Sequence, residues 1–186
     1  MSMKIVLLAA GLSRRMRGEN KLLLPFREST VFEEALKNAL TYTDDVLVVT
    51  GYEREKILEI IKRYKVKEVF NPLYETGQES SIDAALNQLD EDVLISTSDL
   101  PLLTREHFLR AEMGIAEHPC ARPCHEGIPG HPVALTKEIV RKAKKRSIPL
   151  KMLLKANGLY LYKEDIASVS DIDTPEAYDR LLTALS

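Results

Sequence analysis

The chain has 186 residues, a formal net charge of −2 and 45% hydrophobic residues. This length is typical of one domain, here residues 1–186, and the near-zero charge argues against a general nucleic-acid binder, which is usually basic. Its longest apolar run, Ile5–Ala10, is far shorter than the roughly 20 residues of a membrane span. Its 2 cysteines do not make a disulfide framework. We therefore expect a cytoplasmic protein with neither a membrane nor a nucleic acid as a partner.

Apolar strands alternate with amphipathic helices over the first two thirds of the chain. The predicted order is strand Lys4–Ala9, helix Thr30–Leu40, strand Asp45–Thr50, helix Glu53–Tyr64, strand Val66–Phe70, helix Ser80–Leu89, strand Val93–Thr97 and helix Thr104–Glu117. This alternation predicts an α/β fold of three αβα layers around a mostly parallel, doubly wound sheet. Ligands bind beyond the carboxyl ends of such strands. Functional residues should therefore follow the first and fourth strands.

The last third of the chain is less regular. Residues 119–132 contain 4 prolines and 2 glycines, which predicts mainly loop. Beyond them we expect a strand at Val133–Leu135, helices at Lys137–Lys145 and Pro149–Ala156, short strands at Gly158–Tyr162 and Ala167–Val169, and a final helix that starts at Thr174-Pro175.

A basic loop follows the first predicted strand. Gly11 permits a sharp turn, and the cations Arg14, Arg15, Arg17 and Lys21 come soon after it. The loop matches neither the P-loop nor the dinucleotide-binding glycine pattern. Guanidinium groups bind phosphate oxygens in pairs, and lysine adds a point charge, so the loop suits a polyphosphate. The alternative is a solvated basic turn without a ligand.

Acidic residues follow the fourth strand and precede the final helix. Asp99 lies just beyond Val93–Thr97, and Asp171 and Asp173 are two residues apart. Mg²⁺ usually takes one or two protein carboxylates together with substrate phosphates. Asp99 with Asp171 or Asp173 would supply them, and the sequence leaves the choice between the last two open. The alternatives are a turn residue for Asp99 and helix capping for the other two.

Five segments, taken in order, resemble the MobA-like NTP transferase family, and most closely its molybdenum cofactor cytidylyltransferase (MocA-like) branch. They are Leu8-Ala9-Ala10-Gly11 with Ser13, Arg15, Met16, Gly18 and Lys21; Asn71-Pro72 with Gly77 and Ser80-Ser81-Ile82; Ser98-Asp99-Leu100-Pro101; Arg122-Pro123 with Gly127 and Gly130-His131-Pro132; and Asp171-Ile172-Asp173-Thr174-Pro175-Glu176. Arg17 and Ser98 depart from the family, which commonly has glycine at both positions.

The resemblance implies a Rossmann-like fold of the nucleotide-diphospho-sugar transferase type. It also implies a nucleotidyltransferase that uses Mg²⁺ or Mn²⁺ and moves CMP from CTP to the phosphate of the molybdopterin cofactor, with a molybdenum enzyme as recipient. The implied residues are Arg15, Lys21 and Asp99 for catalysis; Leu8, Ala9, Ala10, Gly11, Ser13, Arg15, Lys21, Gln78, Ser80, Ser81 and Asp99 for the nucleotide; Asp99, Asp171 and Asp173 for the metal; and Arg122, Gly130 and His131 for the acceptor.

Two other functions remain open from the sequence. One is a nucleotidyltransferase of the same fold that uses GTP, or that acts on a sugar phosphate or an alcohol phosphate. The Leu-Ala-Ala-Gly and Ser-Ser-Ile segments favour cytidylyl over guanylyl transfer by resemblance. The other is a non-catalytic module that binds a nucleotide or a molybdenum enzyme. The retention of Lys21, Asp99 and Asp173 argues against the second function, because a degraded site would have lost charged groups.

Overall fold

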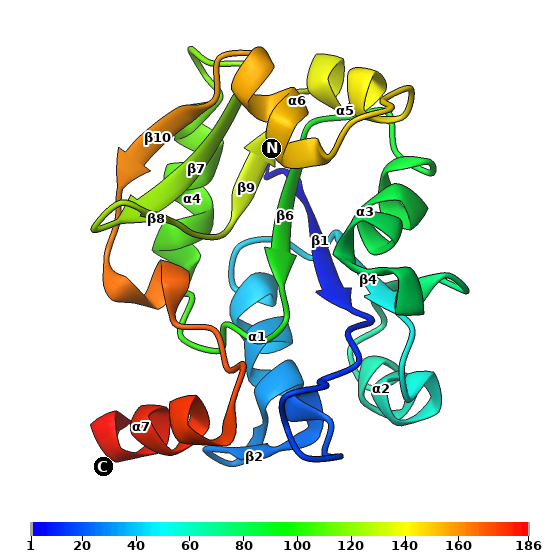
Figure 1. Cartoon of the computed structure of the whole chain (residues 1–186), viewed down its shortest axis with the longest axis vertical. Coiled ribbons are helices and arrows are strands. Elements are labelled where there is room, and N and C mark those ends of the chain that lie inside the picture. Colours follow the sequence, from blue (N-terminus) through cyan, green and yellow to red (C-terminus); the bar gives the residue numbers. More distant parts are fainter. Residues whose placement is uncertain (1, 186) are drawn as a thin grey trace.

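The computed structural model of the chain describes residues 2–185. Its centre is an eight-stranded sheet with the strand order β10-β7-β9-β6-β1-β4-β5, in which β8 pairs with β7 (Figure 1). The strands are β1 (Lys4–Ala9), β4 (Val46–Thr50), β5 (Lys67–Phe70), β6 (Val93–Thr97), β7 (Cys120–His125), β8 (Ile128–Pro129), β9 (Val133–Leu135) and β10 (Tyr160–Lys163). A separate hairpin consists of β2 (Pro25–Phe26) and β3 (Ser29–Thr30). Pairing is parallel among β6, β1, β4 and β5, and between β7 and β10. The predicted mostly parallel α/β sheet is confirmed.

Helices cover both faces of this sheet and complete the three layers. They are α1 (Val31–Leu40), α2 (Arg54–Ile61), α3 (Gln78–Leu86), α4 (Arg105–Gly114), α5 (Lys137–Ala143), α6 (Leu150–Ala156) and α7 (Pro175–Leu185), with short 3₁₀ helices η1 (Lys21–Leu23), η2 (Tyr74–Thr76) and η3 (Ile166–Val169). Alternate residues of β1 enter different cores. Ile5 and Leu7 pack on the side of α1, α2 and α4, and Val6 and Leu8 pack on the side of α3, α5 and α6. A strand buried on both faces is aliphatic throughout for this reason.

The structure corrects two predictions for the last third of the chain. Residues 119–132 are not mainly loop, because β7 and β8 form a hairpin within them. Pro123 removes only one backbone donor from β7, and neighbouring groups of that strand pair with β9 and β10. Residues Ala167–Val169 are not a strand but belong to η3, since the carboxylate of Asp165 accepts a hydrogen bond from the Ala167 N–H and caps a helical turn.

The order of the strands brings distant loops together. β1 lies between β4 and β6, and Leu8 is in register with Thr97, so the loop after β1 and the Ser98–Pro101 turn after β6 leave the sheet side by side. The Ser98 N–H donates to the Leu8 carbonyl at 3.1 Å, which extends this pairing beyond the strands. Among residues 2–185, no helix is long and apolar enough to cross a membrane.

Candidate active site

A cleft of about 680 Å³ lies at the carboxyl ends of β1 and β6. Most of the residues that the sequence nominated line it. They are Leu8, Ala10, Gly11, Ser13, Arg15, Lys21, Gln78, Ser81, Asp99, Gly130, His131, Asp171 and Asp173. The fold therefore brings together the nominated nucleotide, metal and acceptor groups, which lie up to 165 residues apart in the sequence, from Leu8 to Asp173. This is the place where an open α/β sheet binds ligands.

Three nominated residues, Ala9, Ser80 and Arg122, are not part of the lining. Ala9 is 1% exposed and faces the core on the side of α1 and α2. The Ser80 hydroxyl donates to backbone carbonyls in the turn before α3. The guanidinium of Arg122 donates two hydrogen bonds, of 3.0 and 2.7 Å, to the carbonyl of Gly130. These side chains support the wall of the cleft instead of facing a ligand in it.

Lys21 and Arg15 contact the acidic residues directly. The Nζ of Lys21 donates to Asp173 at 2.7 Å and to Asp99, and Arg15 donates to the other oxygen of Asp173. The side chains of Lys21 and Asp99 are only 14% and 11% exposed, so this pairing takes place largely out of bulk water. Arg17, in contrast, lies outside the lining and makes a long, exposed contact with Glu176. Of the four loop cations, Arg14, Arg15 and Lys21 therefore line the cleft, and Arg17 does not.

The last two aspartates are held in place by the backbone between them. The Ile172 N–H donates to the Asp99 carbonyl at 3.1 Å, and the Ile172 side chain is 1% exposed in the core. Because alternate residues of an extended segment face the same way, burying Ile172 turns Asp171 and Asp173 toward the cleft. One carboxylate oxygen from each of Asp99, Asp171 and Asp173 lies within 4.8 Å of the others.

This donor set fits a divalent cation. Oδ1 of Asp99 is buried and has no hydrogen-bond partner among the described residues. A buried, unpartnered carboxylate oxygen is costly, and coordination to a cation would satisfy it. Hard cations such as Mg²⁺ and Mn²⁺ prefer carboxylate oxygens. The structure makes all three carboxylates candidates and does not reduce the choice to Asp171 or Asp173.

The site shifts the pKa values of its members in opposite directions. Burial, a hydrogen bond with Asp173 and the charge of Asp99 raise the pKa of Asp171 to about 6. Burial alone would raise the pKa of Asp173, but the hydrogen bond and charge of Lys21 outweigh it and lower that pKa. Burial alone would lower the pKa of Lys21, yet the two carboxylates raise it. Lys21 is therefore a fixed cation at neutral pH, while the raised pKa of Asp171 brings the titration of its carboxyl toward neutral pH.

The basic loop has its own internal support. The Ser13 hydroxyl accepts a hydrogen bond from the Lys21 N–H at 3.1 Å, and the Asn20 carboxamide accepts one from Leu22 N–H at 3.1 Å. These contacts close the loop on itself and set the direction of Lys21. Arg17 has φ of +54°, in the left-handed region that favours glycine. The arginine thus occupies a backbone conformation that suits the glycine commonly found there in the family.

Several wall residues carried no sequence signal. Tyr74 lines the cleft and packs so closely on Gly51 that a Cβ there would lie 2.6 Å from the Tyr74 Cβ. Ser168 lines the opposite side, and its carbonyl accepts a hydrogen bond from the His131 N–H at 2.9 Å. Both residues reach the cleft through packing between segments that are distant in the sequence. Only a three-dimensional contact, and no local pattern, identifies them.

His131 is the nominated histidine, and it is neutral at neutral pH. Burial and the nearby charge of Arg122 lower its pKa to about 4. Its Nδ1 lies 3.3 Å from the carbonyl of Ile95, and because that oxygen only accepts, Nδ1 carries the proton. Nε2 is then the acceptor nitrogen. The imidazole can accept a hydrogen bond in the cleft but does not supply a positive charge.

Taken together, the fold and the site define a nucleotide-binding α/β enzyme whose loop cations face a carboxylate cluster. Residues 5–158 match the MobA-like NTP transferase domain, and the chain belongs to this family of nucleotidyltransferases. It is 31% identical to the molybdenum cofactor cytidylyltransferase of Escherichia coli over 178 residues, covering 93% of this chain and 92% of that protein. It is 29% identical to the purine catabolism protein PucB of Bacillus subtilis, over 97% and 96% of the two chains.

The fold also matches that of solved structures. A nucleotidyl transferase from Methanothermobacter superposes with a TM-score of 0.85 at 21% identity, covering 98% of this chain and 97% of the other. The likeness extends beyond residue 158 to the segment that carries Asp171 and Asp173. It confirms the predicted α/β nucleotidyltransferase fold over nearly the whole chain.

Proposed function

We propose that the chain acts as a single cytoplasmic domain, residues 1–186, that transfers CMP from CTP to the phosphate of the molybdopterin cofactor and releases pyrophosphate. A molybdenum enzyme would receive the product. The observation that carries this proposal is the meeting of Arg15 and Lys21 with three carboxylates in one cleft. The identity with the Escherichia coli cytidylyltransferase over nearly the full length of both chains supports the choice of base and acceptor.

In this reaction, an oxygen of the acceptor phosphate forms a bond to the α-phosphorus of CTP. The bond between the α-phosphorus and the bridging oxygen to the β-phosphate breaks, and pyrophosphate leaves with the electron pair. No side chain has to form a covalent intermediate. Catalysis then depends on holding the reactants in line and on neutralising charge at the phosphates.

Lys21 and Arg15 are the groups that bind the triphosphate. Both already point into the cleft, where their partners are the carboxylates of Asp99 and Asp173. We infer that they exchange these carboxylates for phosphate oxygens when CTP binds, because both kinds of oxygen accept charge-assisted hydrogen bonds. In the transition state, the same two cations stabilise the negative charge that develops on the departing pyrophosphate.

Asp99, together with Asp171 and Asp173, would hold Mg²⁺ or Mn²⁺. Such an ion, when bound, neutralises phosphate charge and makes the α-phosphorus a better electrophile. The carboxylates contribute more than ligation, since their fixed positions in the turn after β6 and on the segment around Ile172 orient whatever binds between them. The unpartnered Oδ1 of Asp99 is the atom of this set with the clearest need for a ligand.

The two walls of the cleft separate the substrates. Leu8, Ala10, Gly11 and Tyr74 line the wall next to β4 and α3. The small residues Ala10 and Gly11 leave room there for a base and ribose. Gly130 and His131 line the opposite wall. There, the guanidinium of Arg122 donates to the Gly130 carbonyl. His131 is neutral, so its imidazole would take a hydrogen bond from the acceptor substrate and exert no charge on it. We assign the first wall to the nucleotide and the second to the acceptor.

Thermal unfolding with Mg²⁺ and each of CTP, GTP, ATP and UTP tests the choice of nucleotide. A ligand at about 100 times its dissociation constant stabilises the folded state by roughly 2.7 kcal/mol, or about 5–10 °C for a chain of this size. We expect this shift with CTP and not with the purine nucleotides. A shift with GTP alone would instead assign guanylyl transfer to the same site. No shift with any triphosphate would contradict the proposal.

Turnover of an Asp99→Asn variant tests the mechanism. The variant keeps the shape of the side chain and loses its charge, so we expect the release of pyrophosphate to fall by orders of magnitude without loss of the fold. Asp179→Asn removes one charge from an exposed position on α7 and is the matched control. Near wild-type turnover by Asp99→Asn would contradict the assigned mechanism.

A further inference from the structure

We infer that His107, on the far side of the cleft wall, is a positioning residue that acts through Asp165 on the acceptor wall and on the carboxylate cluster. His107 does not line the cleft, and neither the sequence nor the family resemblance pointed to it. The inference rests on the proposed function in one respect: that function assigns the Gly130–His131 wall to the acceptor and the carboxylate cluster to the metal. The contacts themselves belong to the fold.

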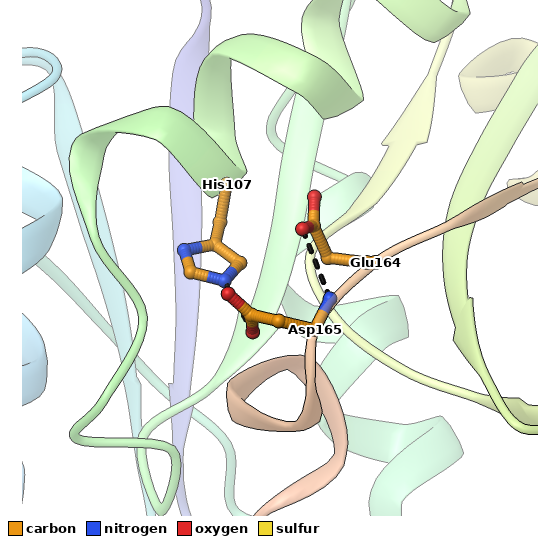
Figure 2. A group of neighbouring side chains, drawn as sticks. All are labelled: His107, Glu164 and Asp165. Carbon is orange, nitrogen blue, oxygen red and sulfur yellow. Dashed lines mark hydrogen bonds and ion pairs between the residues drawn. The ribbon is translucent and has the colours of Figure 1, made fainter.

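His107 is held in one orientation by its own helix. It is the third residue of α4, and its Nδ1 accepts a hydrogen bond of 3.0 Å from the backbone N–H of Thr104. The proton of the neutral ring is therefore on Nε2, which donates to Oδ1 of Asp165 at 3.0 Å (Figure 2). The side chain of His107 is 6% exposed. A buried ring with both nitrogens bonded is a rigid support.

Asp165 connects His107 to η3 through hydrogen bonds. The same oxygen, Oδ1, also accepts the Ala167 N–H at 2.9 Å and caps the 3₁₀ turn. The Asp165 carbonyl accepts the hydroxyl of Ser168 at 2.9 Å. One aspartate thus fixes the turn from both its side chain and its backbone, and His107 fixes the aspartate.

Ser168 connects η3 to the acceptor wall. Its side chain is fully buried, and its carbonyl accepts the backbone N–H of His131 at 2.9 Å. The approach is so close that a Cβ on Gly130 would lie 2.3 Å from this carbonyl oxygen. A shift of η3 would therefore move Gly130 and His131 directly. The same segment continues into Asp171 and Asp173, so it would move the carboxylates as well.

A second contact from α4 strengthens the attachment. Arg110, one helical turn after His107, donates to Oε1 of Glu164 at 3.0 Å, and that oxygen also accepts the Asp165 N–H at 3.0 Å (Figure 2 shows the last contact). Residues three apart share a helix face. His107 and Arg110 therefore bind the two consecutive residues, Glu164 and Asp165, at the start of the segment that leads to the cleft.

His107, Glu164 and Asp165 also have the side-chain types of a metal site, and their ligand atoms lie within 4.8 Å of one another. Two features favour the positioning role. Nε2 of His107 carries a proton and is a donor, so it has no free lone pair for a cation. Arg110 already supplies a positive charge to Glu164. Oε1 of Glu164 and Oδ1 of Asp165 are occupied by hydrogen bonds, while Oε2 of Glu164 is buried without a partner among the described residues. One unpartnered carboxylate oxygen beside a protonated Nε2 and a guanidinium does not make a cation site.

Amide hydrogen exchange of the whole protein tests the inference without any ligand. In His107→Leu, which keeps the bulk and removes the donor, we expect exchange at residues 166–173 to be about threefold to tenfold faster, with β1 unchanged. Asp165→Ala, which leaves every residue of α4 in place and removes the acceptor of His107, should give the same local change. His107→Gln places an amide donor near the position of Nε2 and should restore most of the protection. Met113→Ala, an exposed change on α4, is the matched control.

Binding measurements connect the local change to the site. We expect Mn²⁺, counted by electron paramagnetic resonance, to bind about threefold to tenfold more weakly to His107→Leu, while metal-free CTP affinity stays within about twofold. Uniformly faster exchange, or unchanged exchange and unchanged Mn²⁺ affinity, would overturn the inference. If the wild-type protein binds neither Mn²⁺ nor CTP, the proposed function fails, and the exchange pattern still decides on the positioning role.

Discussion

Asp171→Asn removes a carboxylate that folding places beside two others. The pKa of Asp171 is about 6 instead of an ordinary value near 3.8, chiefly because of burial and then because of Asp173 and Asp99. For an acid, a raised pKa means that the folded state binds a proton more tightly than the unfolded chain. The charged form therefore destabilises the fold above pH 6, and this penalty disappears as the pH falls to about 4.

The size of the effect follows from the same shift. In full it would correspond to about 3 kcal/mol. Asp171 is an exposed residue, and solvent screens the repulsion, so we expect only about 1 kcal/mol. Asparagine keeps the shape and cannot be charged. Without metal, the variant should therefore be more stable than the wild type at pH 8, although it has lost a group of the site.

Urea unfolding in EDTA at a series of pH values measures this difference. We expect Asp171→Asn to gain about 1 kcal/mol at pH 8, or roughly 2–4 °C in Tm, and to converge with the wild type below about pH 4. Saturating Mn²⁺ should reverse the order, because a ligand stabilises the form that binds it better. Asp179→Asn controls for net charge. A variant less stable than the wild type at pH 8 in EDTA, or a difference independent of pH, would refute the reasoning.

Three further substitutions test other parts of the site. Gly130→Ala puts a methyl group 2.3 Å from the Ser168 carbonyl oxygen, a backbone atom, and should lower the free energy of unfolding in urea by about 1–3 kcal/mol; an unchanged midpoint would show that η3 is not packed on this glycine. Lys21→Met should weaken CTP binding by about tenfold or more in calorimetry, since it removes a charged donor; unchanged affinity would remove Lys21 from the triphosphate site. Arg17→Gly should raise stability by about 1 kcal/mol because its φ is +54°, and a loss of stability would mean that the exposed contact with Glu176 contributes more than the backbone strain.

The predictions from sequence that the structure confirms depend on local patterns. β1 and β6 are runs of aliphatic residues, which are typical of strands buried on both faces. Strand–helix alternation then indicates a parallel sheet, and a parallel sheet places its ligands at one edge. That reasoning was sufficient to predict that Lys21 and Asp99 share one edge of the sheet, because they lie in the loops that follow β1 and β6. Both residues line the cleft.

The prediction was wrong where a segment owes its conformation to distant partners. β7 contains Pro123 and has little local strand character, yet it pairs with β9 and β10 on its two sides. We expected a short strand at Ala167–Val169, but the side chain of Asp165 caps this segment as a 3₁₀ turn, and His107 donates to that side chain. In both cases, hydrogen bonds from remote residues outweigh weak local preferences.

The sequence by itself determined the class of fold through hydrophobic periodicity, and the resemblance of five short motifs indicated the family and the charged groups of the cleft. Periodicity and short motifs are properties of neighbouring residues. Only the tertiary structure decided which of these groups face the cleft. In the folded protein, Arg122 and Ser80 donate to backbone carbonyls, and Tyr74 and Ser168 line the walls of the cleft. His107 donates to Asp165, at the start of the segment that leads to Asp171 and Asp173. These outcomes depend on side-chain direction and on contacts across the fold, which arise only when the chain packs.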